Sequence, residues 1–131
     1  MINHPLNHIA LHKRLIETAK AKKYLSYEEV ADMCNLNLSN PDDKNHKLRD
    51  ILDEINKFEN ESNRPMLTVV IVHKSPFKNK MRMCGQGFFI LARQLGKMKP
   101  NQTDEDFFIE ELKRVQDYWE DENENKKRIK D

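Results

Sequence analysis

The spacing of apolar residues changes abruptly at Pro65, and this change constrains the fold more than any other feature of the chain. Before Pro65, apolar side chains recur every three or four residues, as in helices that bury one face. After it, residues 66–72 form a short apolar run rich in β-branched side chains, which is typical of a strand covered on both faces. A chain of 131 residues has room for one core, so we expect these elements to share it.

Three helices are predicted before the change of spacing, each with its own start signal. These signals are a proline in a first turn at Pro5, a capping-box spacing from Ser26 to Glu29, and an Asn-Pro pair at Asn40 and Pro41. The helices are expected to span about residues 5–22, 27–35 and 41–61.

After the apolar run, residues 75–80 are expected to form a loop and residues 81–84 a short return strand. Two helices should follow, at about residues 88–95 and from Thr103 onward. The expected fold is mainly α with a small β hairpin: a winged-helix-like three-helix core, a strand-loop-strand and two C-terminal helices. We expect a single domain over residues 1–121 and a frayed, charged tail over 122–131, where no apolar stripe continues.

The formal net charge of +1 conceals four blocks of alternating sign. Residues 1–23, 24–61, 62–103 and 104–131 carry +4, −6, +8 and −5, counted from the sequence. The third block contains no acidic residue at all. Its cations are Arg64, Lys74, Lys78, Lys80, Arg82, Arg93, Lys97 and Lys99.

This acid-free block has two open interpretations. In the first, a basic wing contacts the phosphates of duplex DNA, with Lys74, Lys78, Lys80 and Arg82 on phosphates and Arg93 near the following turn. In the second, the block faces acidic surfaces of the same chain, of a second copy or of a protein partner, and the chain is an interaction adaptor or a homodimerising module. Both interpretations favour a binding protein over an enzyme.

Several classes of protein do not fit the sequence. No apolar run approaches the roughly 18 residues that a membrane span needs, and the first 23 residues lack the apolar block of a signal peptide. Cys34 and Cys84 form neither a disulfide framework nor a zinc set. We therefore expect a cytoplasmic protein with no membrane partner, no cofactor and no metal.

The segment YLSYEEVA at residues 24–31 is followed by a helix, Pro65, an apolar strand, a basic loop and a glycine-containing turn. This segment and the order of the elements after it resemble the helix-turn-helix part of alkylguanine-DNA alkyltransferases and alkyltransferase-like proteins. The resemblance covers about half the chain and implies a winged-helix shape with duplex DNA as partner. That family has a reactive cysteine in a Pro-Cys-His-Arg motif, whereas this chain has PMLT at residues 65–68, so the resemblance does not imply alkyl transfer. Residues 85–96 and 111–119 resemble small bacterial proteins of the mobile-element kind, which implies no mechanism.

Two clusters could carry chemistry. Cys84 is the best candidate nucleophile, with Arg82 nearby, a Gly85-Gln86-Gly87 turn after it and His73 as a base across the hairpin, which would make the chain a Cys84-dependent transferase. The alternative is a small core residue. His4, His8 and His12 recur every four residues as in some metal sites, but His8 and His12 fall on the apolar side of their helix, so packing histidines are expected.

Overall fold

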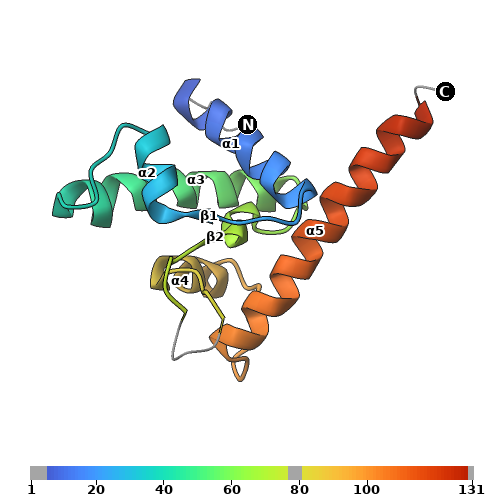
Figure 1. The fold of residues 1–131 in the computed structure, drawn as a ribbon. Coiled ribbons are helices and arrows are strands. Elements are labelled where there is room, and N and C mark those ends of the chain that lie inside the picture. The colour runs from blue at the N-terminus through green and yellow to red at the C-terminus, as the bar shows by residue number, and fades with distance from the viewer. Residues whose placement is uncertain (1–5, 77–80, 130–131) are drawn as a thin grey trace.

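The structure, a computed structural model, describes residues 6–76 and 81–129 (Figure 1). Helices dominate the described residues. In chain order the elements are α1 (Leu6–Lys20), β1 (Leu25–Ser26), α2 (Tyr27–Met33), a π-helical turn η1 (Asp43–Lys47), α3 (Leu48–Glu61), a 3₁₀ turn η2 (Leu67–Val70), β2 (Ile71–Val72), α4 (Gln86–Gln94) and α5 (Asp104–Ile129).

The predicted helices are confirmed, and local capping explains where several of them begin or end. Ser26 and Glu29 form the expected capping box: the Ser26 hydroxyl accepts from the Glu29 N–H at 3.1 Å, and Glu29 accepts in return from the Ser26 N–H. The Thr103 hydroxyl caps α5 by accepting from the Asp106 N–H at 3.1 Å. Gly96, just past α4, has φ +73°, the left-handed conformation that ends helices most easily with glycine.

The β structure differs from the prediction of a hairpin. Among the described residues, the sheet has two strands, and β1 pairs with β2 in parallel, with Leu25 opposite Ile71 and Ser26 opposite Val72. Residues 81–84 form no strand. The predicted strand over 66–72 is likewise reduced to its last two residues, because residues 67–70 turn as η2.

Distant polar groups hold this apolar run in a turn. The buried Glu111 carboxylate of α5 accepts from the Met66 N–H at 2.9 Å, and the Asn56 side chain of α3 accepts from the Thr68 N–H at 3.1 Å. In a strand these two backbone N–H groups would donate to a neighbouring strand, whereas here they donate to side chains. The run is still the centre of the core, as its composition predicts, since every residue from Met66 to Val72 is buried.

The helices surround this central run. Leu11 and Leu15 of α1, Ile55 of α3 and Phe107 of α5 are almost fully buried against it. In Figure 1, α5 passes along one side of the molecule and its C-terminal part projects beyond the other helices. The helix runs to Ile129, past residue 121, where the sequence predicts the domain to end.

The segment after β2 leaves the core and returns to it. The His73 N–H donates to the Met83 carbonyl at 3.0 Å, and Arg82 Nε donates to the His73 carbonyl at 2.7 Å. These two bonds join the two ends of the segment over residues 74–82, called the loop below, although they form no β ladder. Residues 77–80 of this loop, which include Lys78 and Lys80, lie outside the described residues.

Candidate functional site

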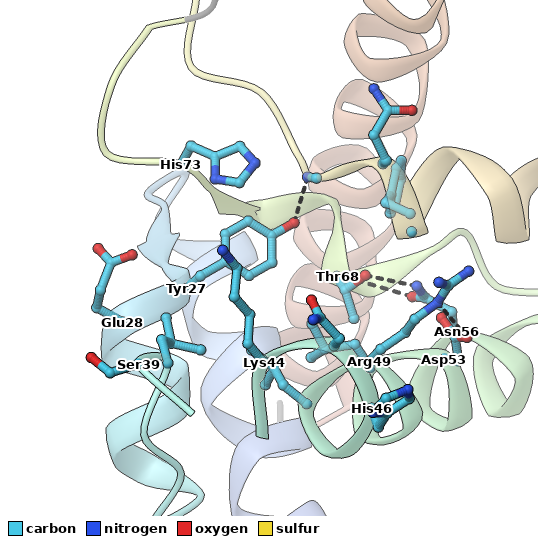
Figure 2. A pocket seen from close by; sticks show the side chains of 18 residues that line it. Tyr27, Glu28, Ser39, Lys44, His46, Arg49, Asp53, Asn56, Thr68 and His73 are labelled. Carbon is cyan, nitrogen blue, oxygen red and sulfur yellow. Dashed lines mark hydrogen bonds and ion pairs between the residues drawn. The ribbon is translucent and has the colours of Figure 1, made fainter. Parts of the chain in front are cut away.

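A hollow of about 900 Å³ on the described part of the molecule is called the main hollow below (Figure 2). Its walls come from the start of α2, the helix from η1 into α3, the η2 turn and the start of α4. Sequence-distant segments therefore meet there. The labelled polar side chains in Figure 2 come from both sides of this hollow.

A reciprocal pair of buried residues, Asn56 and Thr68, lines the deepest-buried part of the wall. Asn56 Nδ2 donates to the Thr68 hydroxyl at 2.7 Å, while Asn56 Oδ1 accepts from the Thr68 N–H at 3.1 Å. The pair satisfies buried polar groups of both residues and fixes η2 against α3. Its role is to hold the wall in shape.

Tyr27 connects the start of α2 to the start of α4. Its hydroxyl accepts from the Gly85 N–H at 2.7 Å, and its ring packs on His73 with centroids 4.9 Å apart. Burial raises the pKa of Tyr27 well above its ordinary value, with a further contribution from Cys84, so the phenol stays neutral. The ring thus offers an aromatic face and a neutral hydroxyl to the main hollow.

Two glycines at the start of α4, Gly85 and Gly87, line this wall. A methyl group at Gly85 would lie 3.4 Å from the Tyr27 hydroxyl, and one at Gly87 would lie 3.4 Å from Arg49 Nε. Both distances are at the short end of ordinary van der Waals contact, so α4 lies close to the tyrosine and the arginine. Gly85 itself is extended, with φ −74° and ψ 168°, so the predicted tight turn is not seen at this residue.

Charged side chains line the outer part of the main hollow. Lys44 and Arg49 come from the η1 and α3 helix, and Arg49 Nε is 3.9 Å from the Asp53 carboxylate. Burial raises the pKa of Asp53, although Arg49 and Lys57 act in the opposite direction. The hollow therefore combines two permanent cations with two carboxylates, Glu28 and Asp53, and burial disfavours the charge of Asp53.

Two cations of the acid-free block are committed to the fold. Arg64 Nε bonds the fully buried Glu59 carboxylate, and Lys97 Nζ lies 3.5 Å from the fully buried Glu111 carboxylate. A buried carboxylate left without its cation is costly, about 3–5 kcal/mol. Arg64 and Lys97 are therefore not free for an external partner.

Two other cations of the block form pairs at the surface. Lys74 Nζ is 3.3 Å from Glu28, and an Arg93 Nη is 3.3 Å from Asp104. Such exposed pairs contribute only about 0–1 kcal/mol, so a phosphate can replace the carboxylate at little cost. Arg93 does not line the main hollow, whereas Lys74 lines an adjoining smaller hollow that shares Glu28, His73, Gly85 and Gln86 with it.

Arg82 binds a backbone oxygen in place of a carboxylate. Its Nε bond to the His73 carbonyl uses one of five guanidinium donors and fixes the side chain at the base of the loop. Among the described residues, no carboxylate lies within 4.0 Å of its guanidinium. Arg82 thus keeps hydrogen-bond donors for an external acceptor.

The candidate nucleophile Cys84 lies inside the core. Its Sγ donates to the Val69 carbonyl at 3.4 Å, and burial raises the pKa of the thiol well above its ordinary value. Within the described part of the chain, no hydrogen bond joins Cys84 to His73, whose ring packs on Tyr27. A neutral, buried thiol lacks the properties of an activated nucleophile.

The histidines of α1 pack against carboxylates of α3. His8 Nδ1 is 3.3 Å from Glu54, and His12 Nε2 bonds the buried Glu59, while His4 lies outside the described residues. Residues 6–76 and 81–129 contain no group of three or more His, Cys, Asp or Glu side chains able to hold a metal ion. None of the helices searched is both long and apolar enough to cross a membrane.

Sequence reasoning missed most residues of the main hollow. Tyr27, Arg49, Asn56 and Thr68 each sit in an unremarkable helical or apolar pattern, and only their tertiary meeting makes a site. Comparison of the chain with protein-family models, with curated proteins and with solved structures gives no match.

Proposed function

We propose that this chain is a non-enzymatic protein that binds duplex DNA through phosphate contacts. The observation that supports the proposal is the meeting of basic side chains from two distant segments. Lys44 and Arg49 line the main hollow, and Lys74 lies at the adjoining hollow that shares His73 with it. Phosphate contacts of this kind position a protein on DNA without reading its sequence.

The ion pairs within this surface support its use as a binding surface. The Lys74 and Glu28 pair is exposed on both sides, and Arg49 stands 3.9 Å from Asp53. Neither contact is worth more than about 1 kcal/mol, so DNA phosphates compete successfully for these cations. Arg82 carries donors that are free of carboxylates, and Lys78 and Lys80 add charge to the same loop by sequence.

In this proposal the loop over residues 74–82 acts as the wing of a winged-helix-like domain, with α1, α2 and α3 as its helical core. The bonds that join the two ends of this segment, at His73 and Met83, support this assignment, although these ends form no β ladder. The outward residues of α3 include Asp50 and Asp53, which oppose base readout. We therefore infer binding with little sequence preference.

The test compares two double variants with equal charge change. Lys74→Glu with Arg82→Glu should weaken binding to a labelled random duplex, measured by fluorescence anisotropy at 50 mM salt. Lys13→Glu with Lys99→Glu, at exposed positions that line neither the main hollow nor the adjoining hollow, is the matched control and should change the affinity much less.

Equal losses from the two double variants would show a general effect of charge and contradict the proposed surface. A protein that fails to bind duplex at all, but shows a concentration-dependent mass in sedimentation, would instead support the adaptor interpretation.

A further inference from the structure

A second concave surface lies on another part of the molecule, between α5 and the segments that precede β1 and follow the loop. We call it the side groove; its volume is about 360 Å³. One wall is formed by two turns of α5, and the other by single residues from distant segments. Its lining residues are Tyr24, Met81, Arg82, Phe108, Ile109, Leu112, Lys113 and Gln116.

Most of the residues that line the side groove are apolar. Tyr24 is 44 % exposed and Ile109 is 50 % exposed, and both belong to the five large apolar side chains that are most open among the described residues. Met81 and Leu112 beside them are only partly buried, while Phe108 closes the floor at 3 % exposure. Apolar residues gathered in one concave patch, rather than scattered, are typical of an interaction site.

Both charged side chains that line the side groove are cations. Arg82 and Lys113 line it, Gln116 adds an amide, and no carboxylate is among its lining residues. Lys113 is paired with Asp117 at 3.3 Å, but both side chains are more than half exposed, so the pair is weak. Arg82 is held in place by the His73 carbonyl and has no carboxylate within 4.0 Å in the described part of the chain.

We propose that the side groove binds an acidic amphipathic helix of a partner protein. The apolar lining of α5 recurs at Phe108, Ile109 and Leu112, which is the spacing at which a second helix can insert apolar residues into a groove. The cations at its margin match Asp and Glu side chains on such a helix and oppose a basic one. The site is separate from the main hollow, since the two share no lining residue.

The test is a selection with the full-length protein against a phage-displayed library of 16-residue helical peptides with randomised surface positions. Enriched peptides should carry apolar residues spaced by three and four positions, with Asp and Glu outnumbering Lys and Arg. A synthetic peptide of the enriched sequence should lose about tenfold in affinity for the Ile109→Lys variant, because one apolar anchor is removed. Lys113→Glu should also weaken binding, by a factor of about three.

The matched control is Ile9→Lys, since Ile9 is 52 % exposed on α1 and lines neither the main hollow nor the side groove. Peptide binding should be unchanged in this variant. The proposal is overturned if the enriched peptides show no acidic preference, or if Ile109→Lys binds as well as the unmodified protein while its thermal unfolding is unchanged. Self-association that Ile109→Lys abolishes would also overturn it, because the occupant would then be a second copy.

None of these variants changes Lys74 or Arg82, so a loss of peptide binding can be told apart from a failure of the proposed DNA contacts. Arg82 lines the side groove and is also a proposed phosphate contact, so duplex and peptide should compete where both bind. A chain that binds no duplex can still bind the peptide, and a chain that binds duplex can still fail to bind the peptide.

Discussion

Asn56 and Thr68 bind each other twice, once through their side chains at 2.7 Å and once from the Thr68 backbone N–H to the Asn56 side-chain oxygen at 3.1 Å. Both residues are buried, at 1 % and 4 % exposure. The pair joins the middle of α3 to η2, and both residues line the main hollow. It fixes the central apolar run as a turn at a point where no strand partner is available.

Replacing Thr68→Val should lower the free energy of unfolding by about 1–3 kcal/mol, because it leaves the Asn56 amide buried without its acceptor. Thr68→Ser is the matched control, since it keeps the hydroxyl and removes only a methyl group, and should cost about 1 kcal/mol. Urea unfolding followed by circular dichroism measures both. If valine costs no more than serine, the side-chain bond contributes nothing to stability.

Glu59 should make the stability of the fold sensitive to acid. Burial alone would raise its pKa, but the bonds and charges of His12 and Arg64 together lower it below the ordinary value. A carboxyl whose pKa is lower in the folded state releases its proton more readily there, so it stabilises the fold above its unfolded pKa of about 4.3. This contribution is lost as the pH falls from about 5 through the folded-state pKa.

The free energy of unfolding should therefore decrease between pH 5 and pH 3 more steeply in the unmodified protein than in Glu59→Gln. The variant should also be less stable at neutral pH, by about 3 kcal/mol, because Arg64 and His12 lose a buried charged partner. Glu17→Gln, at an exposed position of α1, should leave the acid profile as it is. Parallel profiles for Glu59→Gln and the unmodified protein would contradict this role of Glu59.

Cys84 should react with iodoacetamide only after the chain opens. The thiolate is the reactive form, and burial raises the pKa of this thiol well above its ordinary value. Mass spectrometry after labelling at pH 8 should show little modification of native Cys84 and full modification in 6 M guanidinium. Rapid labelling of Cys84 in the native protein would revive the hypothesis of a Cys84-dependent transferase.

Tyr27→Phe tests the contact between α2 and α4. The variant keeps the aromatic ring against His73 and removes only the acceptor of the Gly85 N–H. The free energy of unfolding should fall by about 1 kcal/mol. Tyr24→Phe makes the same chemical change at the more exposed tyrosine and should lower the free energy of unfolding less. Thermal unfolding followed by circular dichroism measures both variants. Equal effects would mean that the Tyr27 hydroxyl is not a structural acceptor.

The helices could be predicted because their signals are local. The Ser26 and Glu29 capping box, the Thr103 cap and the glycine after α4 lie within a few residues of the ends they define. The buried character of residues 66–72 was also readable from composition. The 3₁₀ turn within this run could not be predicted, because it depends on residues far away in the sequence. Glu111 and Asn56, which accept from the Met66 and Thr68 N–H groups, lie 45 and 12 residues away from them.

The parallel sheet could not be predicted for a related reason. Each strand has two residues, too few to show an alternating pattern. The pairing of β1 with β2 depends on tertiary contacts between segments that are far apart in the sequence. The charge pattern predicted the location of the basic block but not the partners of its cations. It identified the acid-free block, but the division of that block into Arg64 and Lys97 on buried carboxylates and Lys74 and Arg82 at the surface depends on tertiary contacts.

The most direct test of the proposed DNA binding is the salt dependence of affinity for a random duplex. Phosphate-directed binding predicts that log K falls linearly with log salt concentration, with a slope of about −0.9 for each phosphate neutralised. The Lys74→Glu and Arg82→Glu double variant should then show a slope smaller in magnitude by about 2. No binding at 50 mM salt, or a slope that this double variant leaves unchanged, would contradict the account.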